Sequence, residues 1–321
     1  MRRRAWTYGP IPLAVAMLTG GCTVDHYARA MVHQNTLNGR VRLWLLGSGE
    51  QMLDQGRIDV HRRIAGFDGT EIDTWVIRDR RADRARRHGE TPIPPTRGTA
   101  VLLHGLLDSK ARFFGLGQRL ANRGFHVVLP DHRVHGRSGG ECVTYGAKEK
   151  RDVRAVVDAL LAEGTVAEPI YVFGFSMGAA VSVEYAAIDD RVRGVMSCAP
   201  YADLRTMTRR VGWWLGADKR REMLARAGEI AGFDPEEVSP EAAAGELTVP
   251  LLVVHGTWDP IVPYEEGLAV YQAAGGPKRM ITIPRMGHVS LLLGREAWFA
   301  DRFEELVAWS RREDRSAVKD R

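Results

Sequence analysis

From Gly98 onward, the chain alternates short, continuous apolar runs with longer stretches of helical periodicity. The apolar runs are "TAVLLHG", "FHVVLPD", "PIYVFGFS", "VRGVMSCAP", "VPLLVVHG" and "KRMITIP". Intervening segments such as "RDVRAVVDALLAEG" and "REAWFADRFEELVAWSRR" place apolar residues at helical spacing. Strands that are apolar throughout and separated by helices are typical of a parallel sheet covered on both faces. The alternation therefore predicts an α/β fold with a mostly parallel central sheet.

Three segments outside this rhythm complete the predicted organisation. "RIDVHRRI" and "EIDTWVIRD", separated by "GFDGT", predict a β-hairpin at the start of the domain. The Arg- and Pro-rich stretch 80–97 is typical of an exposed loop. Residues 201–247 are too many for an ordinary crossover, so they predict a helical insertion or lid. Within it, Trp213, Trp214 and Leu215 would either line an acyl-binding site or anchor the insertion to the core.

The N-terminus has the order of a secretory signal. Arginines at positions 2–4 precede the apolar segment 11–18, and small residues lead into Cys22. The apolar segment is too short to span a bilayer comfortably. We therefore expect a signal segment over 1–22, followed by a helical, partly tethering region over 23–56. "MLTGGC" resembles a bacterial lipoprotein signal, which implies lipidation of Cys22, although Thr19 departs from the usual pattern. A plain signal peptide or a short anchor remains open.

These features predict an exported protein in the cell envelope, with membrane attachment through its N-terminus. The formal charge of +5 comes largely from the terminus and from basic residues within 78–90. A nucleic-acid site needs basic residues organised on one folded face, so we expect no nucleic-acid partner. Cys142 and Cys198 allow one internal disulfide at most, and the sequence leaves their pairing open. A charged tail over 312–321 closes the chain.

The stretch "VFGFSMGAA" places Ser176 between Gly174 and Gly178. A G-x-S-x-G pattern marks a nucleophile elbow only where a strand turns sharply into a helix. Here an apolar run precedes the serine and the small-residue helix start "MGAAVSVEYAA" follows it. Read alone, the pattern would fit a simple turn equally well, so the serine needs partners.

Two partners follow at other predicted strand ends, where α/β sheets bind their ligands. Asp259 lies in "HGTWDPIVP" and His288 in "PRMGHVSLLLG". The chain order Ser, Asp, His is the one expected for this architecture. We interpret His288 as the base for Ser176 and Asp259 as the acid that orients it. Asp203, in "CAPYADL", is a less favoured alternative for the acid.

An oxyanion in such a site needs preorganised N–H donors. The backbone amides of Met177, after the nucleophile, and Leu106, after the first core strand, are the candidates. We expect His104 to be a structural hydrogen-bonding residue. His132 and His135 have no matching set of cysteine or carboxylate ligands, so no metal is predicted. The chemistry itself requires no cofactor.

Taken together, "HG", "DHRVHGRSGG", "GFSMG", "GTWDPIVP" and "MGH" resemble the α/β-hydrolase superfamily over about residues 57–311. They are similar to its serine-aminopeptidase-like and monoacylglycerol-lipase-like esterases. The resemblance implies an α/β-hydrolase fold with a helical lid and a serine hydrolase that cleaves a carboxylic ester through an acyl-enzyme. It assigns a loop-shaping role to Asp131, Arg133, His135, Gly136 and Ser138. Where relatives commonly have "RGHG", this chain has "RVHG".

Other functions remain open on the same residues. A thioesterase, a lipase or a peptidase would use the same triad on a different small-molecule acyl substrate. A non-catalytic, envelope-attached binding protein is an alternative of another class.

Overall fold

The computed structural model describes residues 24–33, 49–92, 94–211 and 214–319. The signal segment, Cys22 and Trp213 lie outside these residues, so the expectations for them stay predictions. Within the described part of the chain, no helix is long and apolar enough to cross a bilayer. Cys142 and Cys198 are both free thiols.

The core is one eight-stranded sheet with the order β1-β2-β4-β3-β5-β6-β7-β8. Strands β1 and β2 form an antiparallel hairpin, and β2 also runs antiparallel to β4. All other neighbours are parallel, so the predicted mostly parallel sheet and its entry hairpin are confirmed. The strands are β1 (Val60–Ala65), β2 (Glu71–Ile77), β3 (Thr99–Leu103), β4 (His126–Pro130), β5 (Ile170–Phe175), β6 (Val192–Cys198), β7 (Leu251–Gly256) and β8 (Lys278–Ile283).

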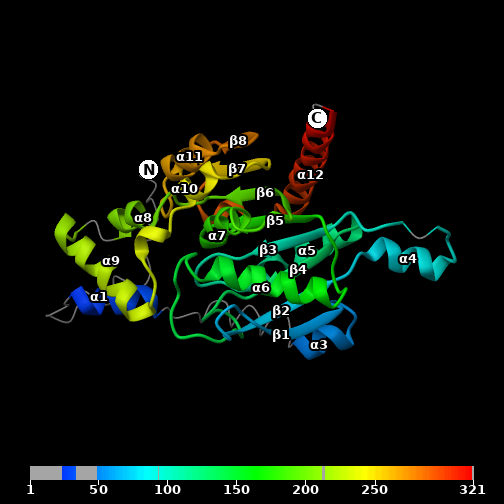
Figure 1. Cartoon of the computed structure of the whole chain (residues 1–321), viewed down its shortest axis with the longest axis horizontal. Helices are drawn as coiled ribbons and strands as arrows, with labels where there is room; N and C mark the ends of the chain where they lie inside the picture. The colour runs from blue at the N-terminus through cyan, green and yellow to red at the C-terminus, as the bar shows by residue number, and fades with distance from the viewer. Residues whose placement is uncertain (1–23, 34–48, 93, 212–213, 320–321) are drawn as a thin grey trace, which may run out of the picture.

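Helices cover both faces of the sheet, and each face has its own apolar cluster (Figure 1). The first cluster joins the sheet to α1 (Val24–Val32), α6 (Glu149–Ala162), α7 (Met177–Ala186), α9 (Ala217–Ala231), α10 (Pro240–Gly245) and α11 (Tyr264–Ala273). The second joins it to α3 (Gly49–Asp54), α5 (Phe114–Asn122) and α12 (Glu296–Lys319). Helix α7 is buried from Met177 to Tyr185 because it lies between the sheet and other helices. This explains why its sequence is small and apolar on every side.

The predicted loop over 80–97 is wrong in its first half, where α4 (Arg80–His88) forms. The Asp79 side chain accepts a hydrogen bond from the Arg81 amide at 2.8 Å and caps the helix. Gly89 ends it in the left-handed conformation, with φ of 66°. Both capping signals are visible in the sequence. The many arginines of this segment nevertheless favour an exposed loop, because they leave the helix without an apolar stripe.

The segment between β6 and β7 is helical, as expected for the insertion. It contains α8 (Leu204–Val211), α9, a short 3-10 turn (Pro235–Glu237) and α10. Helix α1 lies along α9 at one end of the molecule (Figure 1). Arg226 Nε contacts Asp25 Oδ1 at 2.6 Å, and the rings of Tyr27 and Trp214 have centroids 6.3 Å apart. Helix α1 therefore packs on the insertion.

Candidate active site

Ser176 lies at the sharp turn between β5 and α7. Its backbone has φ of 56° and ψ of −120°, a conformation that costs free energy for any residue except glycine. Its amide donates to the Cys198 carbonyl at 2.8 Å, and its own carbonyl accepts from the Ala179 amide at 2.9 Å. The surrounding hydrogen bonds therefore hold a strained strand-to-helix turn, with the half-buried serine at its tip.

The glycines around Ser176 are required by close backbone contacts. A Cβ on Gly174 would lie 2.0 Å from the Gly178 carbonyl oxygen, and one on Gly178 would lie 2.2 Å from the Leu103 carbonyl oxygen. A Cβ on Gly105 would meet the Ser176 Cβ at 3.2 Å. The loop that follows β3 therefore lies directly against the serine.

Asp259 and His288 form a short hydrogen bond at the same edge of the sheet. Asp259 follows β7, and His288 stands just before the short turn Val289–Leu291 that comes after β8. His288 Nδ1 lies 2.6 Å from Asp259 Oδ2, and both residues are buried. The His288 ring lies 4.7 Å, centroid to centroid, from that of Phe175, the neighbour of Ser176. The Asp259–His288 pair therefore lies beside the residue that precedes Ser176.

The surroundings of Asp259 keep its carboxylate ionised. Burial alone would raise its pKa, but contacts from His255, His288 and the Val262 amide outweigh burial and lower the pKa well below its usual range. Asp259 Oδ1 accepts from the amides of Ile261 at 2.9 Å and Val262 at 2.8 Å. A carboxylate on Nδ1 favours the tautomer of His288 that leaves Nε2 as a proton acceptor.

Asp203, the alternative acid, caps a helix. Its Oδ1 accepts from the Thr206 amide at 2.8 Å, which caps the start of α8. The structure thus brings Asp259, and not Asp203, into hydrogen-bond contact with His288.

The backbone amides of Met177 and Leu106 are the predicted oxyanion donors. Met177 is the first residue of α7, so its N–H has no partner within the helix. Leu106 follows Gly105, which packs against Ser176. Neither amide makes a hydrogen bond within the described residues. The next residue, Leu107, has φ of 62° and donates its amide to His135 Nε2 at 3.1 Å.

The loop 131–138 is held by contacts within itself and by one contact to α6, in agreement with its predicted loop-shaping role. Arg133 makes a bidentate contact with Asp152, with both distances 2.8 Å. A Cβ on Gly136 would lie 2.0 Å from Asp131 Oδ2. Ser138 Oγ donates to the Asp131 carbonyl at 2.8 Å. These residues hold the loop rigidly beside the one that carries Leu106.

The histidines of this region form a buried, neutral group. His104 Nδ1 lies 2.8 Å from the Gly105 carbonyl, and its Nε2 accepts from the His132 amide at 3.0 Å. Burial, with charge repulsion from neighbouring histidines, lowers the pKa of His104 well below its usual value and that of His132 to about 3. His104 therefore has the surroundings of a structural residue. Across the described ranges, no cluster of three or more potential metal ligands occurs.

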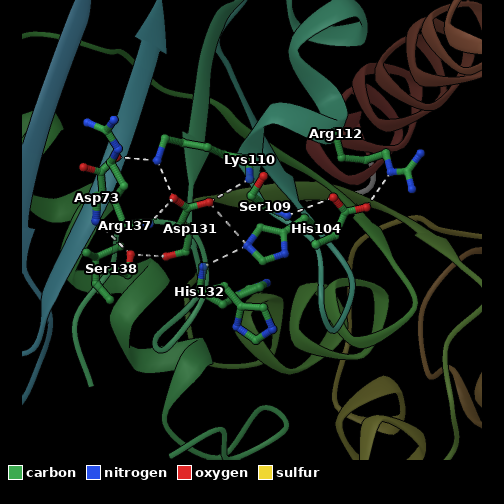
Figure 2. A network of polar contacts seen from close by, with 12 residues as sticks. Asp73, His104, Ser109, Lys110, Arg112, Asp131, His132, Arg137 and Ser138 are labelled. Carbon is green, nitrogen blue, oxygen red and sulfur yellow. Dashed lines mark hydrogen bonds and ion pairs between the residues drawn. The ribbon is translucent and has the colours of Figure 1, made fainter. Parts of the chain in front are cut away.

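Lys110, in the same loop as Leu106, is a residue that the sequence reading missed. Its side chain is fully buried and contacts the carboxylates of Asp73 and Asp131 (Figure 2). Lysine is rarely buried without a partner. The local sequence "DSKARFF" gives no sign that Lys110 is buried against two carboxylates from other segments.

Four exposed apolar side chains, called the apolar rim below, lie near Asp259 or His288 in the chain. Among the described residues, the exposed large apolar side chains are Trp258, Ile261, Val289 and Leu293, which are 66, 50, 50 and 61% exposed. Trp258, Ile261 and Val289 lie within two residues of Asp259 or His288, and Leu293 lies five residues after His288. Exposed apolar groups gathered on one part of a surface commonly mark a binding site.

Comparisons with known proteins agree with this architecture. Residues 94–229 match the family described as Serine aminopeptidase, S33. The uncharacterized protein YqkD of Bacillus subtilis is 28% identical over 195 residues, 58% of this chain and 63% of YqkD. The match thus spans less than two thirds of that relative. A monoacylglycerol lipase of Mycolicibacterium smegmatis is 35% identical over 99 residues, 30% of this chain and 35% of the lipase. Among solved structures, the Pyrococcus furiosus esterase Pf2001 superposes with a TM-score of 0.60 at 20% identity, covering 80% of this chain and 94% of the esterase.

Proposed function

We propose that the chain is an α/β-hydrolase of the esterase- and lipase-like kind, and that it is a serine hydrolase that cleaves a carboxylic ester. The observation that carries the proposal is the 2.6 Å hydrogen bond between His288 and Asp259 beside the strained turn at Ser176. An unactivated serine hydroxyl is a weak nucleophile, and this pair is the means of activating it.

The proposed mechanism assigns one role to each group. His288 Nε2 takes the proton of Ser176 Oγ as the oxygen attacks the ester carbonyl, while Asp259 stabilises the imidazolium that forms. The amides of Leu106 and Met177 hold the oxyanion of the tetrahedral intermediate. His288 then protonates the leaving alcohol, and water, activated by the same histidine, releases the acid from the acyl-enzyme.

The apolar rim favours an ester with an apolar acyl or alcohol part. Trp258 and Leu293 expose large hydrophobic side chains within five residues of Asp259 or His288, and burying them against substrate would be favourable. The matched part of a monoacylglycerol lipase supports the same class of substrate. A thioester or a peptide amide would meet the same triad, and the rim gives neither an advantage over an ester.

A series of p-nitrophenyl esters of increasing acyl length tests the proposal. We expect turnover by the wild type and its loss in Ser176→Ala, together with loss of covalent labelling by a fluorophosphonate. Ser182→Ala is the matched control, because that hydroxyl, on the same helix, donates to the Ala179 carbonyl at 2.7 Å. Turnover that survives Ser176→Ala would refute the nucleophile. Absence of turnover with every ester, thioester and aminoacyl substrate would favour the non-catalytic binding protein.

We further propose attachment to the cell envelope through a lipid on Cys22. The order of charges, apolar residues and small residues before it supports this location. Metabolic labelling with a radioactive fatty acid should mark the wild type and not Cys22→Ser. An unlabelled wild type would leave a plain signal peptide as the explanation.

A further inference from the structure

We propose that Lys110 is a positioning residue that holds the amide of Leu106 where it receives the oxyanion. The proposal rests on the serine hydrolase function above. It concerns a lysine that contacts none of the groups of the triad.

Lys110 is a fully buried cation between two carboxylates. Its Nζ contacts Asp73 Oδ1 and Asp131 Oδ2, and lies 5.0 Å from the centroid of the Trp75 ring (Figure 2). Asp73 comes from β2 and Asp131 follows β4. The lysine therefore joins the loop after β3 to two neighbouring strands of the sheet.

The same loop is held at several points along its length. The Lys110 amide donates to Asp131 Oδ1 at 2.7 Å, so both backbone and side chain of this residue bind one carboxylate. The Leu107 amide donates to His135 Nε2 at 3.1 Å. Leu106 thus lies between Gly105, packed on Ser176, and a run of residues fixed to the loop after β4.

The network extends from the loop to the molecular surface. His61 Nε2, on β1, lies 2.9 Å from Asp73 Oδ2, and His61 Nδ1 lies 3.5 Å from the exposed Glu50. Burial would raise the pKa of Asp73, but His61 and Lys110 outweigh it and lower the pKa to about 2. The lysine therefore faces ionised oxygen on β2.

A positioning role explains why a charged group is kept here. The free energy lost by removing two charges from water offsets most of the attraction between them. Apolar residues of similar volume therefore often stabilise a core equally well. A lysine between two carboxylates adds direction, because it fixes where the loop meets each strand. An oxyanion donor displaced from its place loses much of its effect on the transition state.

The test uses Lys110→Met/Asp73→Asn, which removes the cation together with one carboxylate. Asp131 then keeps the amides of Lys110 at 2.7 Å and Arg137 at 3.1 Å. Asp189→Asn is the matched control. Asp189 is also buried and ion-paired, with Arg191 Nη2 at 2.7 Å, but it lies just before β6, in the turn that leads into the strand. Each variant is assayed with a p-nitrophenyl ester and with a trifluoromethyl ketone, whose adduct carries an oxyanion.

We expect the double variant to lose about ten- to a hundred-fold in kcat, less than the loss of a whole oxyanion donor. Its inhibition constant for the ketone should rise in parallel, with KM within about two-fold, because only the transition state uses the amide. Asp189→Asn should lower the melting temperature and leave kcat per folded molecule unchanged.

A folded double variant with the kcat and ketone affinity of the wild type would overturn the proposal. If that variant does not fold, Asp73→Asn alone replaces it, because Lys110 then keeps Asp131. A smaller loss in the same two constants is expected, and wild-type values would again overturn it. A wild type that hydrolyses no ester and binds no ketone would instead refute the proposed function.

Discussion

Glutamine in place of Glu184 should make the stability of the protein less dependent on pH. Glu184 lies on α7 and is fully buried, and neither carboxylate oxygen makes a hydrogen bond of ordinary geometry among the described residues; a weak contact from the Ser239 backbone is the smallest influence on its pKa. A Cβ on Gly146 would lie 1.8 Å from its Oε2, which shows how closely the backbone packs on it. Lys150 Nζ is 4.0 Å away. Burial, opposed by Lys150 and reinforced by Glu149, raises the pKa of Glu184 to about 8.

The sign and size of the change in unfolding free energy follow from the protonation of Glu184 in the folded and unfolded chains. Between pH 4.5 and about 8, folded Glu184 keeps a proton that the unfolded chain has released. The free energy of unfolding therefore falls as pH rises through this window. The upper limit is about 5 kcal/mol, because each pH unit contributes about 1.4 kcal/mol. Glu184→Gln is neutral in both states and escapes this loss.

Urea unfolding from about pH 5 to about pH 8.5 measures the effect. We expect the free energy of unfolding of Glu184→Gln, relative to wild type, to rise by at least about 2 kcal/mol across that range. Any packing defect of the glutamine adds a constant, so the slope with pH is the readout. Glu222→Gln, at an exposed position of α9, is the control and should show no such slope. A flat difference for Glu184→Gln would show that the buried carboxyl is ionised in the folded protein and refute the reasoning.

Further predictions concern the candidate active site. Gly178→Ala places a Cβ 2.2 Å from the Leu103 carbonyl oxygen, so we expect a loss of about 3 kcal/mol or more in urea unfolding; wild-type stability would contradict the close contact. Asp259→Asn should lower kcat by about 10³- to 10⁴-fold, because the amide favours the wrong tautomer of His288; ester kinetics showing less than about a ten-fold fall would argue against the pair. Trp258→Ser should raise KM for long acyl esters by about ten-fold and leave acetate esters unchanged, because only long chains bury the indole; equal changes for both would remove the rim from substrate binding.

The fold was largely predictable because its strongest signal is local. Five of the six continuous apolar runs become strands that are buried almost throughout, whereas the last becomes the partly exposed edge strand β8. The order of the strands in the sheet was not predicted from the sequence. The contact between Asp259 and His288, beside the turn that carries Ser176, was also predictable, because carboxyl ends of parallel strands share one edge. Their catalytic roles stay predictions.

Contacts between distant residues were not predictable. Lys110 meets Asp73 across 37 positions, and Arg226 meets Asp25 across 201. No periodicity in one segment encodes a partner in another, so buried charge appears in a sequence as ordinary surface charge. Helix α4 was missed for a different reason, since its caps at Asp79 and Gly89 carry the signal that its arginines hide.

The contact between α1 and α9 would influence the orientation of a lipid-anchored form of the protein relative to the membrane. One residue separates Cys22 from Val24, the first residue of α1. Asp25 and Tyr27 contact the insertion. A lipid on Cys22 would therefore be joined to a packed helix by a single residue and not by a long linker. If Cys22 carries a lipid, the insertion would lie close to the bilayer. A substrate leaving the bilayer would then meet the insertion first, because α1 and the lipid lie on that side of the molecule.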